Sequence, residues 1–120
     1  MQREVEVVGI GNDVVAVVTP YDSRTDEEFV LGNIMAWPVA CQWEISDLSP
    51  RLFSDKAHRL IAGVICRLRD GGQIIRRRRV MARLGKGTAA AQEAERIYQE
   101  TSLDVGVGRA LARLKEKTNR

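Results

Sequence analysis

The sequence feature that most constrains the fold is an apolar stripe of helical period between residues 57 and 68. Apolar side chains recur there at positions i, i+3, i+4, i+7, i+8 and i+11, which are Ala57, Leu60, Ile61, Val64, Ile65 and Leu68. Residues at this spacing share one face of an α-helix, so the segment must bury that face against another layer. Ser54 is placed to cap this helix and Gly71-Gly72 to end it. We therefore expect Leu60 to be largely buried.

Three segments upstream of this helix have the patterns of strands. Residues 3–10 alternate between charged and apolar side chains, residues 14–19 are rich in valine, and Gly11-Asn12-Asp13 is a turn between them. In residues 39–45, alternate side chains share one face of a strand, namely Val39, Cys41, Trp43 and Ile45. We expect Trp43 to be buried on the sheet face that the helix covers.

Helices are indicated elsewhere by capping residues and apolar spacing. Thr25 and Glu28 spell the capping box T-x-x-E, which predicts the start of a short helix that Trp37-Pro38 ends. Near the other end of the chain, residues 88–101 and 105–117 have the apolar spacing of two further helices. A basic connector separates these two helices from the apolar stripe.

Together these elements predict an α+β fold in a chain of one-domain size. Residues 1–72 are expected to form a small, mainly antiparallel three-stranded sheet with two packed helices, in the order β-β-α-β-α. Residues 73–120 add the basic connector and the C-terminal helical pair, which we expect to form one compact unit with the core. A length of 120 residues with 44% hydrophobic residues is sufficient for a single buried core.

The net charge of +3 conceals an uneven distribution along the chain. Residues 1–66 hold five basic and ten acidic residues, a net charge of −5, whereas residues 67–120 hold fourteen and six, a net charge of +8. Such an asymmetry is typical of a chain whose basic end binds a polyanion or a protein partner.

No segment has the pattern of a membrane anchor or a secretory signal. The longest apolar runs, residues 14–18 and 35–41, are much shorter than the roughly 20 residues needed to span a bilayer. Glu4 and Glu6 interrupt the stretch that a secretory signal would keep apolar. Two cysteines are too few for a disulfide scaffold. We therefore expect a cytoplasmic protein that does not contact membranes.

The residues that common enzyme and metal sites require are missing or badly spaced. His58 is the only histidine and is expected on a helix surface, and Cys41 and Cys66 form no C-x-x-C pair, so we expect no metal and no cofactor. His58 and Cys66 lie about 12 Å apart along one helix, too far for a catalytic dyad. Residues 9–11 lack the third glycine of a dinucleotide fingerprint, and residues 85–88 depart from P-loop spacing. These absences favour a protein that is not an enzyme.

The strongest functional signal is the basic segment of residues 67–86, which carries a net charge of +7. Its four consecutive arginines cannot all point away from the core, whether the segment is a helix or a strand. At least one guanidinium must pair with an acid, extend along apolar surface or stand on a projecting element. Clustered guanidinium groups suit phosphate binding, and the candidate contact residues are Arg76, Arg77, Arg78, Arg79, Arg83 and Lys86.

Two alternatives to phosphate binding account for the same basic segment. The arginines can form a solvated edge strand that pairs with the acidic front half, within one chain or across a dimer. The second alternative is that the arginines bind an anionic protein partner. The preference for arginine over lysine itself needs no functional reason, because a GC-rich genome would produce it. At residues 85–88, Lys86 and the free N–H groups of the next helix suit a phosphate, and a plain helix cap at Thr88 is the alternative.

The stretch from Glu93 to Lys117 resembles the paired helices of a helix-turn-helix. The likeness rests on Ala94 and Ile97 or Tyr98 in the first helix, on Leu103 in the turn, and on a second helix with an apolar and a basic face. Its apolar face holds Val107, Leu111 and Leu114, and its basic face holds Arg109, Arg113 and Lys115. It departs from the motif because the turn is one residue short and Ser102 stands where glycine is usual. The resemblance implies that Arg109 and Arg113 face a DNA groove or phosphates. A helical hairpin that packs on the sheet or dimerises is the alternative.

These patterns favour a non-enzymatic protein that binds DNA or RNA through phosphate contacts of its connector and helical tail. The alternative is a small interaction or inhibitor protein, such as one encoded by a phage or other mobile element, that docks on a protein partner. Its acidic face or its arginine cluster would then be the contact. A homodimer is compatible with both functions.

Overall fold

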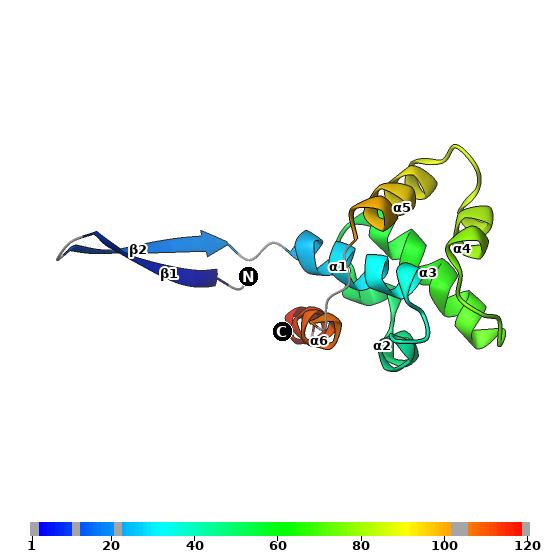
Figure 1. Cartoon of the computed structure of the whole chain (residues 1–120), viewed down its shortest axis with the longest axis horizontal. Helices are drawn as coiled ribbons and strands as arrows, with labels where there is room; N and C mark the ends of the chain where they lie inside the picture. Colours follow the sequence, from blue (N-terminus) through cyan, green and yellow to red (C-terminus); the bar gives the residue numbers. More distant parts are fainter. Residues whose placement is uncertain (1–2, 11–12, 21–22, 102–105, 119–120) are drawn as a thin grey trace.

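The computed structural model describes residues 3–10, 13–20, 23–101 and 106–118. The elements in chain order are β1 (Arg3–Ile10), β2 (Asp13–Pro20), α1 (Ser23–Ala36), α2 (Gln42–Asp47), the 3-10 helix η1 (Pro50–Leu52), α3 (Lys56–Asp70), α4 (Arg77–Leu84), α5 (Ala89–Glu100) and α6 (Val107–Thr118). β1 and β2 pair in antiparallel fashion, from Arg3 opposite Pro20 to Ile10 opposite Asp13. Figure 1 shows this pair standing apart from the helices, which gather into one globule. Residues 11–12 of the predicted turn lie outside the described residues.

The predicted α+β core is wrong, because the core of the described chain is built from helices. Most of its fully buried apolar side chains come from α1, α3, α4, α5 and α6, with Phe53 added from the segment after η1. Those from the helices include Leu31, Ile34, Ile61, Ile65, Val80, Ala94 and Leu114. Among the described residues, β1 and β2 pair with each other and no third strand joins them. From α1 to α6 the chain is therefore an all-α globule of six helices.

The third predicted strand, residues 39–45, is instead a turn followed by α2. The N–H of Cys41 donates to the carbonyl of Trp37 at 3.1 Å, and the N–H of Ile45 donates to the carbonyl of Cys41 at 2.9 Å. This i to i−4 spacing is helical. Cys41 and Ile45 face the core in either structure, because positions four apart share a face of a helix and of a strand. Trp43 distinguishes the two structures, and it is 77% exposed where the sequence predicted burial.

The helix predicted from the apolar stripe is present as α3, but two of its residues lie differently from expectation. Ile61, Ile65 and Leu68 are buried as predicted, whereas Leu60 is 46% exposed. His58, expected on the surface, is only 1% exposed. The apolar stripe is wider than the core requires, so Leu60 lies at its outer edge.

The N-terminus of α3 is capped by Asp55, not by Ser54. Asp55 Oδ1 accepts hydrogen bonds from the N–H groups two and three residues later, at 2.8 and 3.2 Å. Ser54 instead donates its N–H and its hydroxyl to Glu27 in α1. Ser54, the predicted cap of α3, thus connects the start of α3 to α1.

The boundaries of the other helices agree to different degrees with the sequence patterns. α1 begins at Ser23, so Thr25 of the predicted capping box lies inside the helix. The two C-terminal helices are present as α5 and α6, and Thr88 caps α5 as predicted. The basic connector contains a further helix, α4, that was not predicted.

α1 lies at the centre of the globule and packs against α3, α5 and α6. Gly32 permits the close approach of α1 to the C-terminal end of α5. A Cβ atom at Gly32 would lie 1.9 Å from Thr101 Oγ1 and 3.0 Å from Ile97 Cγ2. Thr101 is held in place by a 2.6 Å hydrogen bond from its hydroxyl to the carbonyl of Ile97.

Replacing Gly32 with alanine should destabilise the fold by about 1–3 kcal/mol, because Thr101 must move and lose its hydrogen bond. Gly63→Ala in α3 is the matched control, since a Cβ there meets nothing closer than 3.8 Å. Better helix propensity should then stabilise the control by up to about 1 kcal/mol. Urea denaturation measures the free energy of unfolding of both variants. Equal changes in that free energy would contradict the close contact at Gly32.

Candidate functional site

The eight basic residues predicted to contact nucleic acid lie on two separate parts of the globule. Arg76 to Arg79, Arg83 and Lys86 belong to α4 and its flanks, whereas Arg109 and Arg113 belong to α6. Figure 1 shows α4 and α6 on different sides of the helical globule. The structure therefore does not bring these residues together into one surface.

Two of the eight form ion pairs with other residues that the structure describes. Arg77 lies 2.7 Å from Glu95 of α5, and its guanidinium is 4.8 Å from the centre of the Tyr98 ring. Arg113 donates two hydrogen bonds, of 2.8 and 2.7 Å, to the Asp26 carboxylate of α1. Of the three arrangements that the sequence left open for the arginine cluster, Arg77 adopts pairing with an acid. Arg113, predicted to face a groove or phosphates, instead joins α6 to α1.

The other basic residues around α4 face solvent. Arg79 donates a 3.2 Å hydrogen bond to the carbonyl of Ile74. The remaining four are exposed, and in the described part of the chain no ion pair engages them: Arg76, Arg78, Arg83 and Lys86. Arg109 of α6 is likewise exposed.

The segment of residues 85–88 forms a tight turn and a helix cap. Gly85 and Gly87 have φ angles of 94° and 82°, which other residues rarely adopt. Thr88 Oγ1 accepts a 3.2 Å hydrogen bond from the N–H of Ala91. One of the free N–H groups at the start of α5 is therefore already satisfied within the chain, and the turn holds α4 beside α5.

An open groove of about 540 Å³ lies between α3, α4 and α5. Apolar side chains form much of its lining, including Ala57, Leu60, Val64, Leu84 and Ala90. Three basic residues also line it, Lys56 and Arg67 from α3 and Arg83 from α4, and no acidic residue is among the described residues that do so. Figure 1 shows the three helices that enclose it. We call this feature the α3–α4–α5 groove.

Positive charge is concentrated at one end of the α3–α4–α5 groove. Val64, Arg67 and Arg83 line an adjoining hollow of about 260 Å³. Arg67 and Arg83 are both exposed, and no ion pair within the described ranges neutralises them. Two guanidinium groups beside one hollow create a positive potential that attracts an anionic group.

Sequence reasoning did not identify Lys56, Leu60 or Arg67 as surface-site residues. Leu60 was assigned to the core because its spacing fits the apolar stripe. One signal was present, since basic residues lie four positions before Leu60 and seven positions after it and so share its helix face. The positions of α4 and α5, which turn this face into a groove, could not be read from that spacing.

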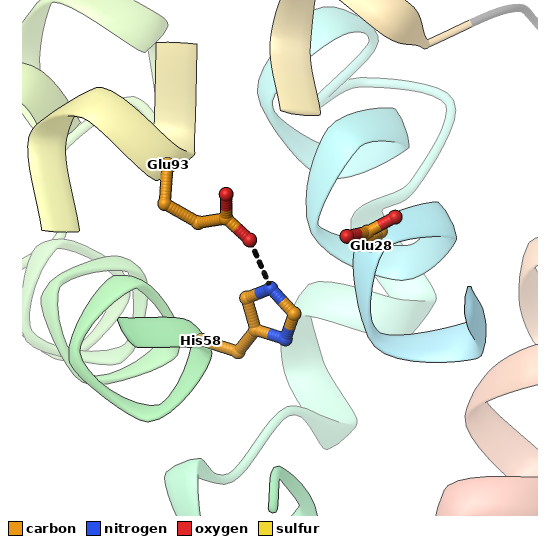
Figure 2. A group of neighbouring side chains, drawn as sticks. All are labelled: Glu28, His58 and Glu93. Carbon is orange, nitrogen blue, oxygen red and sulfur yellow. Dashed lines mark hydrogen bonds and ion pairs between the residues drawn. The ribbon is translucent and has the colours of Figure 1, made fainter. Parts of the chain in front are cut away.

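A second cluster, centred on His58, is buried between α1, α3 and α5. His58 Nδ1 lies 2.8 Å from Glu27 Oε1, and His58 Nε2 lies 2.8 Å from Glu93 Oε2. Glu27 is fully buried and also accepts hydrogen bonds from Ser23 and Ser54. Figure 2 shows Glu28, His58 and Glu93 converging from these three helices.

The hydrogen bonds of His58 require a protonated imidazole. A neutral ring donates from only one nitrogen, but both nitrogens here face carboxylate oxygens. Burial alone would lower the pKa of His58, yet the two carboxylates raise it above its ordinary value of 6.5. Burial likewise opposes ionisation of Glu27, but hydrogen bonds from His58, Ser54 and Ser23 lower its pKa to about 2. The Arg96 guanidinium, with help from His58, lowers the pKa of Glu93 to about 2.

The same cluster offers carboxylate ligands that the sequence analysis did not consider for a metal. One ligand atom each of Glu28, His58 and Glu93 lies within 4.8 Å of the others. Arg96 occupies this position, however, because it pairs with Glu28 and donates 2.8 and 2.9 Å hydrogen bonds to Glu93. A metal would have to displace Arg96 and deprotonate His58. The arrangement therefore suits a structural ion-pair network better than a metal site.

The two cysteines are not activated as nucleophiles. Both are buried. Burial, assisted by the charge of Glu44, raises the pKa of the Cys41 thiol to about 11, and burial also raises the pKa of Cys66. A thiol with a raised pKa carries little of the reactive thiolate form at neutral pH.

No known protein family, curated protein or solved structure matches the chain. Within the described residues, no helix is both long and apolar enough to cross a membrane. The function must therefore be inferred from the groove, the exposed basic residues and the buried cluster.

The His58 cluster predicts how stability depends on pH. Because the pKa of His58 is raised above 6.5, its contribution is complete below that pH and is lost as the pH rises through the raised pKa. The pKa values of Glu27 and Glu93 fall from 4.5 to about 2, so their contributions are present above pH 4.5 and are lost on acidification toward pH 2. The melting temperature should therefore be highest between roughly pH 4.5 and 6.5.

His58→Gln should cost about 3–5 kcal/mol at pH 6, since it leaves the buried Glu27 carboxylate with only the more distant Lys117, 3.7 Å away, as its cation. The loss of stability above pH 6.5 should also disappear in this variant. Glu93→Gln should reduce the free energy of unfolding by less than His58→Gln does, because Glu93 is partly exposed. Thermal melts between pH 3 and 9 measure the profiles, and an unchanged alkaline decline in His58→Gln would contradict the assignment.

Proposed function

We propose that this chain is a non-catalytic docking module that binds a protein partner through the α3–α4–α5 groove. The observation that carries the proposal is Leu60, a large apolar side chain that is 46% exposed where it lines a groove of about 540 Å³. Exposed apolar side chains that share a groove favour binding of another protein chain, because their burial releases water. The basic residues around the groove add orientation and specificity.

Two features favour a protein partner over nucleic acid as the main ligand. Arg77 and Arg113 already pair with acids of the same chain, so they contribute less to a phosphate-binding surface. The lining of the groove is also largely apolar, with Leu60 and Val64 contributed by α3 and Leu84 by α4. Nucleic-acid interfaces are more polar and more uniformly basic than this.

A display library of random 18-residue peptides should yield binders that depend on Leu60. Leu60→Asn keeps the side-chain size but removes its apolar surface, and it should weaken these binders by at least about tenfold. Val39→Asn is the matched control, because Val39 is 83% exposed and lies outside the groove. Circular dichroism establishes that both variants remain folded. If no selected peptide depends on Leu60, the groove is not a docking site.

Nucleic-acid binding is the second candidate function, favoured by the exposed residues Arg76, Arg78, Arg83 and Lys86. If each of these four contacts a phosphate, log affinity for duplex DNA should fall with log salt at a slope of about −3.6. Arg78→Ala combined with Arg83→Ala should reduce that slope by about 2, whereas Arg109→Ala on α6 should leave it unchanged. Fluorescence anisotropy measures the slopes for duplex DNA and single-stranded RNA. Absence of binding at 50 mM salt would eliminate this candidate.

A further inference from the structure

We infer that the occupant of the α3–α4–α5 groove is an amphipathic helix of a partner protein, with acidic residues at both ends of its apolar face. The inference rests on the proposed docking function and specifies the chemistry of the partner. It follows from the arrangement of charge around the groove, from the length of its α3 wall and from its apolar lining.

The basic residues are placed at both ends of the α3 wall. Lys56 begins α3, and Arg67 lies eleven residues later in the same helix. At 1.5 Å per residue, about 16 Å separates their positions, which corresponds to about three turns of a partner helix. Leu60 and Val64 lie between them on the same face. A partner helix lying along this wall would present apolar residues at i, i+3 or i+4, and i+7, with its charged residues beyond them.

The sign of the charge on the partner follows from the lining. Three basic residues and no acidic residue are among the described residues that line the groove. The N-terminus of α5 also meets the groove at Thr88, Ala89 and Ala90, and its helix dipole adds positive potential. A basic partner helix would be repelled at both ends of this groove, whereas an acidic one would be attracted.

The strongest polar contact is expected at the hollow lined by Val64, Arg67 and Arg83. A carboxylate placed between the two guanidinium groups would accept hydrogen bonds from both and relieve their mutual repulsion. Within the described residues, α5 and α6 pair Arg96 and Arg113 with acids of the chain, but nothing comparable reaches Arg67 or Arg83. The partner is therefore expected to supply the missing acid.

The test uses the Leu60-dependent peptides from the display library and asks which residues flank their apolar positions. We expect aspartate or glutamate at both flanks and an increase in helicity on binding. Replacing the flanking acids of a selected peptide with glutamine should weaken its binding to the wild-type chain about tenfold, as measured by isothermal titration calorimetry at 50 mM salt.

A charge-neutral variant of the protein provides the matched control. In Arg67→Gln combined with Arg83→Gln, the acidic and glutamine forms of the peptide should bind within about threefold of each other, since the charge preference is lost. Arg109→Gln on α6 should retain the full preference, because Arg109 does not line the groove.

The outcomes separate this inference from the proposed function. Leu60-dependent peptides with neutral or basic flanks would overturn the acidic helix and leave the docking function intact. Selected peptides that bind without becoming helical would also overturn the inference of a helical partner and leave the docking function intact. A chain whose dimerisation in sedimentation velocity is abolished by Leu60→Asn would identify a second copy as the occupant and overturn the inference. If no Leu60-dependent peptide is found, both proposals fail.

Discussion

The ion-pair network around the buried imidazolium of His58 is the interaction on which the arrangement of helices depends. Its two ring nitrogens connect Glu27 of α1 to Glu93 of α5, and His58 itself belongs to α3. Leaving a buried charge without a partner is strongly destabilising, so the network favours the register of the three helices in which His58, Glu27 and Glu93 are all paired. Because α3 and α5 are two of the three walls of the groove, the same network fixes the distance between those walls.

The uneven charge of the sequence is partly explained by pairing between its two halves. Helix α6 and the end of α5 supply cations to acids near the start of the helical globule, in the pairs Arg96–Glu28, Arg113–Asp26, Lys115–Asp47 and Lys117–Glu27. Four acids of α1 and α2 are thus paired with cations of α5 and α6 in the same chain. Pairing of basic and acidic residues within one chain was one of the alternatives to phosphate binding. It explains three cations of α6, but among the described residues only Arg77 of α4. A net charge summed over a segment cannot distinguish these cases, because it does not say which residues meet.

Sequence reasoning succeeded where local signals were sufficient and failed where distant residues decide the structure. α3, α5 and α6 were predictable from apolar spacing and from caps such as Thr88. α2 was not, because Cys41 and Ile45 satisfy strand and helix periods equally, and the wrong choice also misplaced Trp43. The burial of His58 depends on Glu27, 31 residues away, and on Glu93, 35 residues away. Of the candidate site, the sequence analysis named Arg83 as a contact residue, but it did not predict the groove that Arg83 lines.

The exposure of Leu60 follows from the geometry of α3. An apolar stripe that occupies more than one third of a helix circumference cannot be buried by a single layer. The inner edge of the stripe, with Ile61 and Ile65, is buried in the core, and its outer edge, with Leu60, lines the groove together with residues of α4 and α5. α4 contributes arginine to this second side, and the turn at Gly85 and Gly87 sets how near α4 lies to α5. α3 therefore has two apolar edges. The chain buries the inner edge completely but leaves the outer edge, at Leu60, partly exposed.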